Sequence, residues 1–446
     1  MSTSGSGPES DVVVQKYGGS SLATTGQVLR VAERVGALVR AGRQVVVVVS
    51  AQGDTTDRLI SLADEINPRP TGRELDQLLA TGETSSAALM AMAIQHTGLR
   101  ATALSGARSG ILATGPHGAG IIVAVDTEEL RTLLDDGQAV VIAGFQGVSA
   151  DGDIVTLGRG GSDTTAVAVA AELGAHACEI YSDVPGVLTA DPRVVPTARL
   201  MPDIDVEVMT EMAFAGARVM HARAVELAAL YDVDILVGSS TASSAGTRIH
   251  ARDGDEMLES KAAVMAVVHD TDVARVTLRA RSAPVNPDIP DGPVNPVNPE
   301  SPEDPSSAVF RYLARHSIPA DMTAVVHAPD GGFSFGLTVH RSHASGVRES
   351  FAGLTAPEQG HIEVEEEVAK VSVVGRGLLS RPVYASRMLS ALTAAGICAQ
   401  SLSASQSRVS VMVPAADTRR AVGLLHSEFG LDADAESTPR RLASHP

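Results

Sequence analysis

Four glycine-rich or polar turns carry the residue types that could perform chemistry in this chain. The first reads KYGGSS, from Lys16 to Ser21, and follows an apolar run. Two adjacent glycines let backbone N–H groups approach phosphate oxygens closely, and a helix N-terminus after such a turn adds partial positive charge. Lys16 adds a point charge. Taken alone, the motif does not distinguish a phosphate site from an ordinary strand–helix turn.

The other three turns combine glycine with charged or polar residues. Residues 158–163, GRGGSD, pair an arginine with an aspartate across two glycines, just before an Ala/Val-rich stretch. A merely solvated Arg–Asp pair explains this poorly, because the double glycine costs backbone entropy without packing anything. The third turn is YSDVPGVLTADPR at 181–193, and the fourth is GARVMH at 216–221. Its histidine, His221, is by itself more typical of a helix face than of catalysis.

These turns lie between short apolar runs and longer amphipathic stretches. We expect buried strands at Val12–Gln15, Val45–Val49, Ala139–Ala143, Cys178–Tyr181 and Val233–Val237. We expect helices at Gly26–Arg40, Glu74–Gln95, Thr127–Asp135, Asp163–Leu173 and Met209–Leu230. Strands rich in Val and Ile, without alternation, indicate a mostly parallel sheet covered on both faces. Residues 11–250 therefore read as an α/β domain, and open α/β sheets bind ligands at strand–helix turns.

The second half of the chain has a different character. Strand, helix, strand, strand and helix patterns between Ala369 and Glu428 predict a small ferredoxin-like α+β module, placed at residues 366–436. Residues 261–345 resemble a damaged copy of it. Within that copy, prolines recur at every third position from 284 to 305, as a polyproline II rod would require, although an extended solvated loop is the simpler alternative. Two such modules after a catalytic domain suggest ligand sensing.

The bulk composition excludes several classes of partner. The chain has 53 acidic and 35 basic residues, a net charge of −18, which disfavours nucleic acid and anionic membranes. No apolar run reaches the roughly 18–20 residues that span a bilayer. Residues 1–10 and 437–446 read as tails, and the first lacks the basic and apolar regions of a signal peptide. Cys178 and Cys398 have no metal-ligand spacing and suit a reducing compartment, so a cytoplasmic protein is expected.

Taken together, the motifs resemble those of the aspartate kinases of the amino-acid-kinase superfamily. Their residues are most similar to those of actinobacterial members. KYGGSS, SAQGDTTD, TGETSSA, AGFQGV, TLGRGGSDTTA and EIYSDVPGVLTADPR occur in the family's order. The likeness is dense from Val12 to about Ile249 and resumes from Lys370 to Leu431. It implies an α/β sandwich around a mostly parallel sheet, followed by two ferredoxin-like ACT modules that hold a homo-oligomer together. It also implies ATP and Mg²⁺ as cofactors, and L-aspartate or a close analogue as substrate.

The resemblance assigns roles to residues at matching positions. Lys16 is expected to neutralise the transferring phosphoryl group, and Asp163 to orient Lys16 or a metal-bound water. The residues that would bind the amino acid are Ser50, Thr56, Glu83 and Arg159. The residues that would contact ATP are Lys16, Tyr17, Gly18, Gly19, Ser20, Ser182, Asp183, Leu188, Arg193, Arg218 and Val219.

The physical chemistry of aspartate agrees with these roles. An amino acid with two carboxylates and one ammonium needs a bidentate cation such as Arg159 and an anion such as Glu83. Its side-chain carboxylate has a reference pKa of about 3.9, so it is already ionised and needs no general base. The obstacle is the approach of two anions. The site must therefore supply positive charge and in-line positioning.

Several positions depart from the family pattern. Leu188 stands where relatives commonly have a tyrosine that helps to hold the nucleotide, and Arg218 replaces a lysine. Thr84 replaces an arginine. In the first module the proline segment replaces an effector-binding turn, and residues 321–326, DMTAVV, lack the family's Gln-Asn pair. These changes predict weakened feedback by lysine and threonine, as would suit a specialised biosynthetic pathway.

Three alternatives stay open. The substrate could be a modified aspartate. Another activity of the superfamily, such as acetylglutamate or uridylate phosphorylation, is disfavoured by TGETSSA and by the paired C-terminal modules. A non-catalytic amino-acid-sensing subunit is disfavoured because Lys16, Arg159 and Asp163 are all present.

Overall fold

The computed structural model describes residues 12–68, 70–241, 246–250, 264–280, 305–316, 318–327, 333–352 and 360–432. The chain forms two compact units, which are described separately below: residues 1–188 with 199–259, and residues 189–198 with 260–446. The expected tails and almost all of the expected proline segment lie outside the described residues. Its last proline, Pro305, begins a helix, a position that tolerates the missing N–H.

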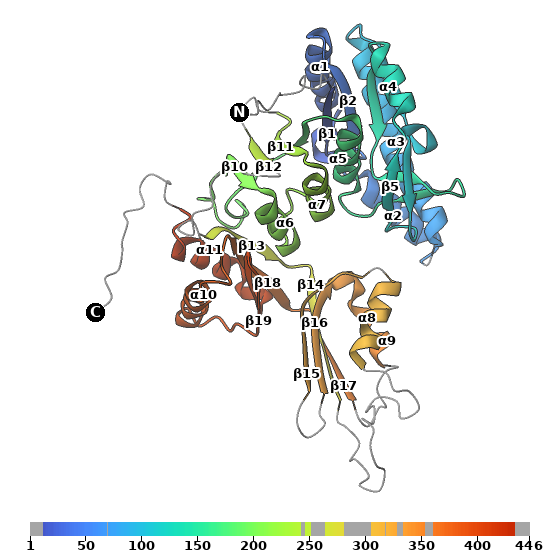
Figure 1. The fold of residues 1–446 in the computed structure, drawn as a ribbon. Coiled ribbons are helices and arrows are strands. Elements are labelled where there is room, and N and C mark those ends of the chain that lie inside the picture. Colours follow the sequence, from blue (N-terminus) through green and yellow to red (C-terminus); the bar gives the residue numbers. More distant parts are fainter. Residues whose placement is uncertain are drawn as a thin grey trace, which may run out of the picture. The chain divides into compact units, whose positions relative to one another are not determined.

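The first unit is built on an eight-stranded sheet in the order β10-β12-β11-β9-β1-β2-β6-β3 (Figure 1). All neighbouring strands are parallel except β11 and β12, so the expected mostly parallel sheet is confirmed. The strands are β1 Val12–Tyr17, β2 Gln44–Val49, β3 Ala101–Leu104, β6 Ala139–Ala143, β9 Ala177–Ser182, β10 Asp203–Asp205, β11 Asp234–Ser239 and β12 Thr247–His250.

Helices cover both faces of this sheet. Helices α1 (Thr25–Arg40) and α3 (Gly72–His96) pack on one face in a shared apolar cluster, and α5 (Gly161–Leu173) packs on the other, against β1, β2 and β9. Helix α1 begins where it does because Thr24 and Gln27 form a reciprocal capping box. The remaining helices of the unit are α2 Thr55–Ile66, α4 Glu128–Asp135, α6 Val206–Ala215 and α7 Ala222–Tyr231.

Two features of the first unit differ from the sequence-based expectation. The single helix expected at Met209–Leu230 is two helices, because Gly216 ends α6 with φ +117° and α7 begins only after the extended residue His221. A second, small sheet in the order β5-β4-β7-β8 was not expected. Its strands are β4 Ile111–Thr114, β5 Ile121–Val125, β7 Gln146–Val148 and β8 Ile154–Thr156.

The second unit contains two sheets of four antiparallel strands. The first has the order β15-β16-β14-β17, which is the ferredoxin-like order, and helices α8 and α9 lie on one of its faces (Figure 1). Its core includes Val276, Leu278, Val309 and Phe335. The elements are β14 Val273–Ala280, α8 Pro305–Arg315, β15 Ala320–His327, β16 Phe333–His340, α9 Ala344–Ala352 and β17 Gly360–Glu365. This sheet has the full strand order, where the sequence suggested a damaged copy.

The second sheet has the order β13-β18-β20-β19 and packs against helices α10 and α11. The elements are β13 Val264–Asp270, β18 Val368–Gly375, α10 Val383–Ala394, β19 Ser401–Ala404, β20 Arg408–Pro414 and α11 Thr418–Glu428. Strand β13 pairs antiparallel with β18. The second module thus takes its fourth strand from residues that precede the first module, whereas the sequence placed that strand in the first. Among the described residues, no helix is long and apolar enough to cross a membrane.

Asp76 fastens the small sheet of the first unit to α3. Its side chain is buried and accepts hydrogen bonds from the backbone N–H groups of Gly118 and Thr156 and from the Thr156 hydroxyl, at 2.7–3.0 Å. His117 lies 3.1 Å from the same carboxylate. A buried donor that has lost its water and found no acceptor destabilises the folded state. The Asp76 carboxylate prevents this for three donors at once.

We therefore expect Asp76→Ala to destabilise the first unit by about 2–4 kcal/mol, measured by chemical denaturation. Glu74, an exposed acid in the first turn of the same helix, is the matched control. Its replacement by alanine should leave stability close to that of the wild type. Equal effects of the two substitutions would contradict the anchoring role.

Candidate active site

The alternation of side chains along β1 directs Lys16 toward α5. Strand β1 lies between β2 and β9, with Lys16 level with Val48 and Ile180. Successive side chains of a strand point to opposite faces, so Tyr17 faces α1 and α3 while Lys16 faces α5. The Lys16 ammonium lies 2.5 Å from the carboxylate of Asp163, in the first turn of α5. The side chains are only 12% and 10% exposed, so this is a largely buried ion pair.

The glycine turn after β1 packs tightly against the turn after β2. Gly53 donates its N–H to the Gly19 carbonyl, and Gly18 donates to the Tyr181 carbonyl at the end of β9. A Cβ atom on Gly19 would lie 2.5 Å from the carbonyl oxygen of Ala51, so no other residue fits there. The backbone of three strand ends is thereby brought together beside Lys16, as the glycine motif predicts for a phosphate cradle.

Tyr17 packs in the apolar core next to this turn. Its side chain is fully buried and stacks on Tyr181 with ring centroids 5.0 Å apart. Burial raises the pKa of Tyr17 well above its usual range, so the ring remains neutral. Its carbonyl accepts a hydrogen bond from the N–H of Ser50. The predicted nucleotide contact of Tyr17 is therefore not available to its side chain, which belongs to the core.

Glu83 reaches the same strand end from the middle of α3. One carboxylate oxygen accepts the N–H of Ala51 at 3.0 Å. The other is buried and has no hydrogen-bond partner among the residues that the structure describes. Burial raises the pKa of Glu83 from 4.5 to about 7. A buried carboxylate with one unsatisfied oxygen is suited to a cationic group that a ligand brings.

The second glycine turn holds Arg159 at an exposed position before α5. Gly158 and Gly160 have φ of +74° and +69°, in the left-handed region that favours glycine. A Cβ atom on Gly160 would also overlap the ring of His221. Burial lowers the pKa of that histidine, which favours its neutral form. The two glycines thus fix the turn that separates Arg159 from Asp163.

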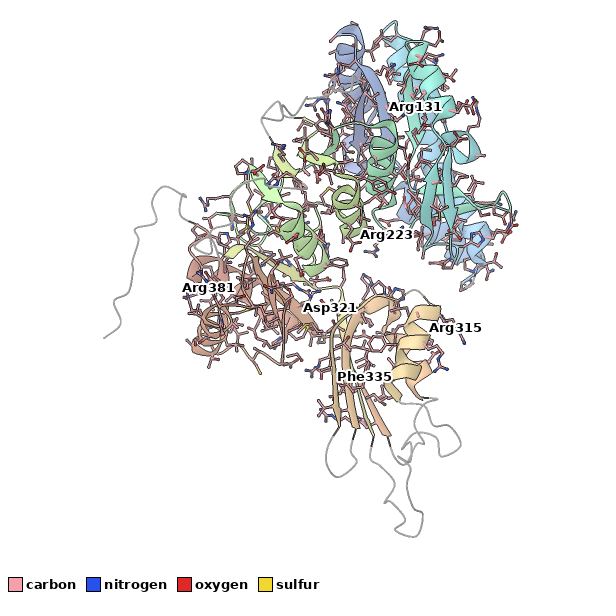
Figure 2. All side chains as sticks on the ribbon, in the orientation of Figure 1. Arg131, Arg223, Arg315, Asp321, Phe335 and Arg381 are labelled. Carbon is pink, nitrogen blue, oxygen red and sulfur yellow. The ribbon has the colours of Figure 1, made fainter. Side chains whose placement is uncertain are left out.

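The sequence analysis missed Arg223, which holds this turn from α7 (Figure 2). Its guanidinium donates to the carbonyls of Leu157 at 2.8 Å and Gly120 at 2.9 Å. Leu157 directly precedes the glycine turn. The available signal was an arginine in the first turn of the largely apolar stretch ARAVELAALY.

The remaining predicted residues occupy the surrounding loops. Ser182 ends β9 and its hydroxyl accepts the N–H of Val184. Ser20 follows the first glycine turn, Thr56 lies in the first turn of α2, Asp183 follows Ser182, and Arg218 and Val219 connect α6 to α7. Leu188 pairs with Leu200 in an antiparallel bridge.

Arg193 is the one predicted site residue that does not belong to the first unit. Its guanidinium pairs with Asp191 at 2.7 Å, and both lie in the segment that belongs to the second unit. Among the predicted site residues, Lys16 and Asp163 contact each other directly. Gly18, Gly19, Ser50 and Glu83 lie at the neighbouring strand ends, where they form hydrogen bonds with backbone groups of Tyr181, Gly53, Tyr17 and Ala51. Within the described part of the chain, no three His, Cys, Asp or Glu side chains are placed to hold a metal ion.

Comparisons with known proteins agree with this architecture. Residues 11–239 match the model of the amino acid kinase family, and residues 371–429 match an ACT domain. The aspartokinase of Mycolicibacterium smegmatis is 42% identical over 431 residues, which are 96% of this chain and 98% of that protein. Aspartokinase 2 of Bacillus subtilis is 39% identical over 422 residues, 94% of this chain and 98% of that protein.

Among solved structures, Escherichia coli aspartokinase III in complex with aspartate and ADP superposes with a TM-score of 0.75. It is 24% identical and matches 94% of this chain and 99% of its own, which shows a common fold. Identity near 40% over almost the whole length establishes more than the fold. The chain belongs to the aspartokinase family, kinases in which an amino acid kinase domain is followed by ACT domains.

Proposed function

We propose that this kinase transfers the γ-phosphoryl group of ATP to the β-carboxylate of L-aspartate and forms 4-phospho-L-aspartate. The observation that carries the proposal is the buried Lys16–Asp163 pair beside a glycine cradle at the carboxyl end of the central strand. The family membership supports the same reaction, since the similar E. coli enzyme is described with aspartate and ADP.

The reaction requires little proton chemistry. An oxygen of the aspartate β-carboxylate attacks the γ-phosphorus, the bond from that phosphorus to the β–γ bridging oxygen breaks, and ADP leaves with the electron pair. No proton has to be removed from the nucleophile, because a carboxylate is ionised at neutral pH. Lys16 and the backbone N–H groups around Gly18 and Gly19 would stabilise the charge on the transferring group. Asp163 would hold Lys16 in place.

The amino acid would be held by groups of opposite charge. Glu83, with its unsatisfied buried oxygen, would accept the substrate ammonium. Arg159 would grip the α-carboxylate, for which its planar guanidinium provides two parallel donors. Mg²⁺ that arrives with ATP is held mainly by phosphate oxygens and neutralises their charge.

Lys16→Ala should lower kcat at least about 100-fold, in line with the loss of a preorganised charge. Because the ion pair is buried, this variant also leaves Asp163 uncompensated, which destabilises the fold. The double variant Lys16→Ala, Asp163→Asn removes that charge and should regain stability without regaining activity. A well-folded double variant with nearly wild-type kcat would exclude Lys16 from catalysis.

The raised pKa of Glu83 predicts the pH dependence of aspartate use. The ammonium of the substrate needs an ionised Glu83, so kcat/KM for aspartate should rise as pH increases through about 7 and then level off. Glu83→Gln should lower kcat/KM and abolish this step, whereas kcat/KM for ATP should keep its wild-type pH profile. An unchanged aspartate profile in the variant would contradict the role.

The same substitution should stabilise the folded protein. The native state holds the Glu83 proton more tightly than the unfolded chain, so its contribution to stability falls as pH rises from 4.5 through about 7. Above that pH the penalty is on the order of 3 kcal/mol, since a tenfold change in proton affinity corresponds to about 1.4 kcal/mol. Glu83→Gln should therefore unfold at higher denaturant concentration at pH 8.

A panel of amino acids decides between aspartate and the alternatives. Acyl phosphates react with hydroxylamine, so ATP-dependent hydroxamate formation reports the reaction directly. Aspartate should be the preferred acceptor over modified aspartates and N-acetylglutamate. A folded protein that forms no hydroxamate with any of them would favour an amino-acid-sensing subunit.

Regulation by lysine and threonine should be weak in this chain. The sequence of residues 284–305 supports this expectation, because each of its prolines lacks an N–H that could hold an effector carboxylate. We expect 1–5 mM lysine and threonine, alone or together, to change the initial rate less than about twofold, since an effector without differential affinity shifts no equilibrium. Strong inhibition by the pair would show that a pocket persists.

A further inference from the structure

The segment Thr189–Ala198 leaves the catalytic unit and becomes part of the second unit. It is flanked by Leu188 and Leu200, which form an antiparallel bridge, and Met201 donates its N–H to the Val187 carbonyl at 2.9 Å. The stretches of chain just before and just after the segment are therefore hydrogen-bonded to each other. Three of the residues predicted to contact the nucleotide lie here: Ser182 and Asp183 precede the bridge, and Leu188 forms part of it.

The segment is built into the core of the second module. Ala190 and Val195 are buried in the same apolar cluster as Val371 and Leu425. The carbonyl of Thr189 accepts the N–H of Val267 in β13. The segment cannot move away from the module without exposing apolar surface, so its position depends on the module's packing.

His426 of α11 contacts one end of the segment directly and the other end through Asp432. Its side chain is fully buried, with Nε2 2.9 Å from the Thr189 hydroxyl and Nδ1 2.8 Å from a carboxylate oxygen of Asp432. Asp432 also accepts hydroxyl hydrogen bonds from Thr197 at 2.6 Å and Ser427 at 2.7 Å. A carboxylate only accepts, so Nδ1 donates to it and Nε2 is left for Thr189.

A hydroxyl, an imidazole and a carboxylate in a row also occur in hydrolases. That chemistry does not fit here, because Thr189 is 4% exposed and His426 is completely enclosed, so no substrate could reach the hydroxyl. A buried, fully paired network of this kind instead specifies one position for the groups that it joins. The group joined here is the residue that follows Leu188.

We propose that His426 is a positioning residue for nucleotide binding, which acts through Thr189 to fix the loop Ser182–Leu188. This inference rests on the proposed function, because it takes that loop as the nucleotide contact. A displaced Thr189 would therefore lower the affinity for ATP and leave Glu83 and Arg159, the residues proposed to bind aspartate, untouched.

Two substitutions of His426 separate its two hydrogen bonds. Glutamine places an amide nitrogen near the position of Nε2, and asparagine places one near Nδ1. His426→Asn, which loses the contact with Thr189, should raise KM for ATP and the Kd for ADP roughly fivefold to tenfold, as expected for one lost buried hydrogen bond. His426→Gln should stay closer to wild type. KM for aspartate should change less than about twofold in both, in the absence of a direct contact.

Thr189 provides the complementary pair. Thr189→Val removes the hydroxyl with little change of shape and should reproduce the effect of His426→Asn, whereas Thr189→Ser should restore wild-type ATP affinity. Ser427→Ala removes a hydrogen bond to the same Asp432 without affecting Thr189, and controls for general loosening of the module. Calorimetric titration with ADP, together with thermal unfolding, reads affinity apart from turnover and folding.

Equal rises of both Michaelis constants, or wild-type ADP affinity in folded Thr189→Val, would overturn the positioning role. Such results in an enzyme whose wild type forms hydroxamate from aspartate would leave the proposed function intact. A wild-type protein that binds ADP but phosphorylates no amino acid would contradict the proposed function and leave the positioning role of His426 intact.

Discussion

Lys16 and Asp163 form an ion pair that is largely shielded from water at the end of β1. Both side chains remain charged only if the surrounding protein provides the stabilisation that water would otherwise give. The N-terminus of α5 does so for Asp163, because its partial positive charge favours a carboxylate in the first turn. Helix α5 begins there because Gly158 and Gly160, both in the left-handed region of φ, turn the chain sharply next to the His221 ring. The glycines, the helix start and the strand alternation thus act together to hold one cation at one point.

Glu83 shows the opposite solution to the same problem. Lys16 has an internal counter-ion, whereas Glu83 has a backbone N–H on one oxygen and nothing on the other among the described residues. Burial alone dominates its raised pKa. A fold selected only for stability would place a neutral or apolar group at this position. The unsatisfied oxygen is therefore best understood as capacity kept for a charged ligand, a local conflict of the kind that functional sites retain.

The sequence predicted the central strands well because uninterrupted valines such as Val45–Val49 have no alternative to burial on both faces. It missed the small sheet, because strands of three to five residues are too short to show a measurable period. The glycine motifs drew attention to Lys16 and Asp163, which form an ion pair, but they did not indicate that the Tyr17 side chain is buried in the core. Strand alternation already implied that Lys16 and Tyr17 face opposite sides. The tertiary partner of Arg223 could not be read from a single helix.

The second unit carries a further limit on such predictions. A strand pattern does not say which sheet the strand joins, and β13 and β14, only two residues apart, join different sheets. The two sheets are also tied by Asp321 of β15, which contacts Lys370 and Arg408 of the other module at 2.7–3.0 Å (Figure 2). Burial alone would raise the pKa of Asp321, but these two cations hold it well below its usual range. Because separating the modules would break these partly buried ion pairs, the two modules and the built-in segment Thr189–Ala198 should respond as one body.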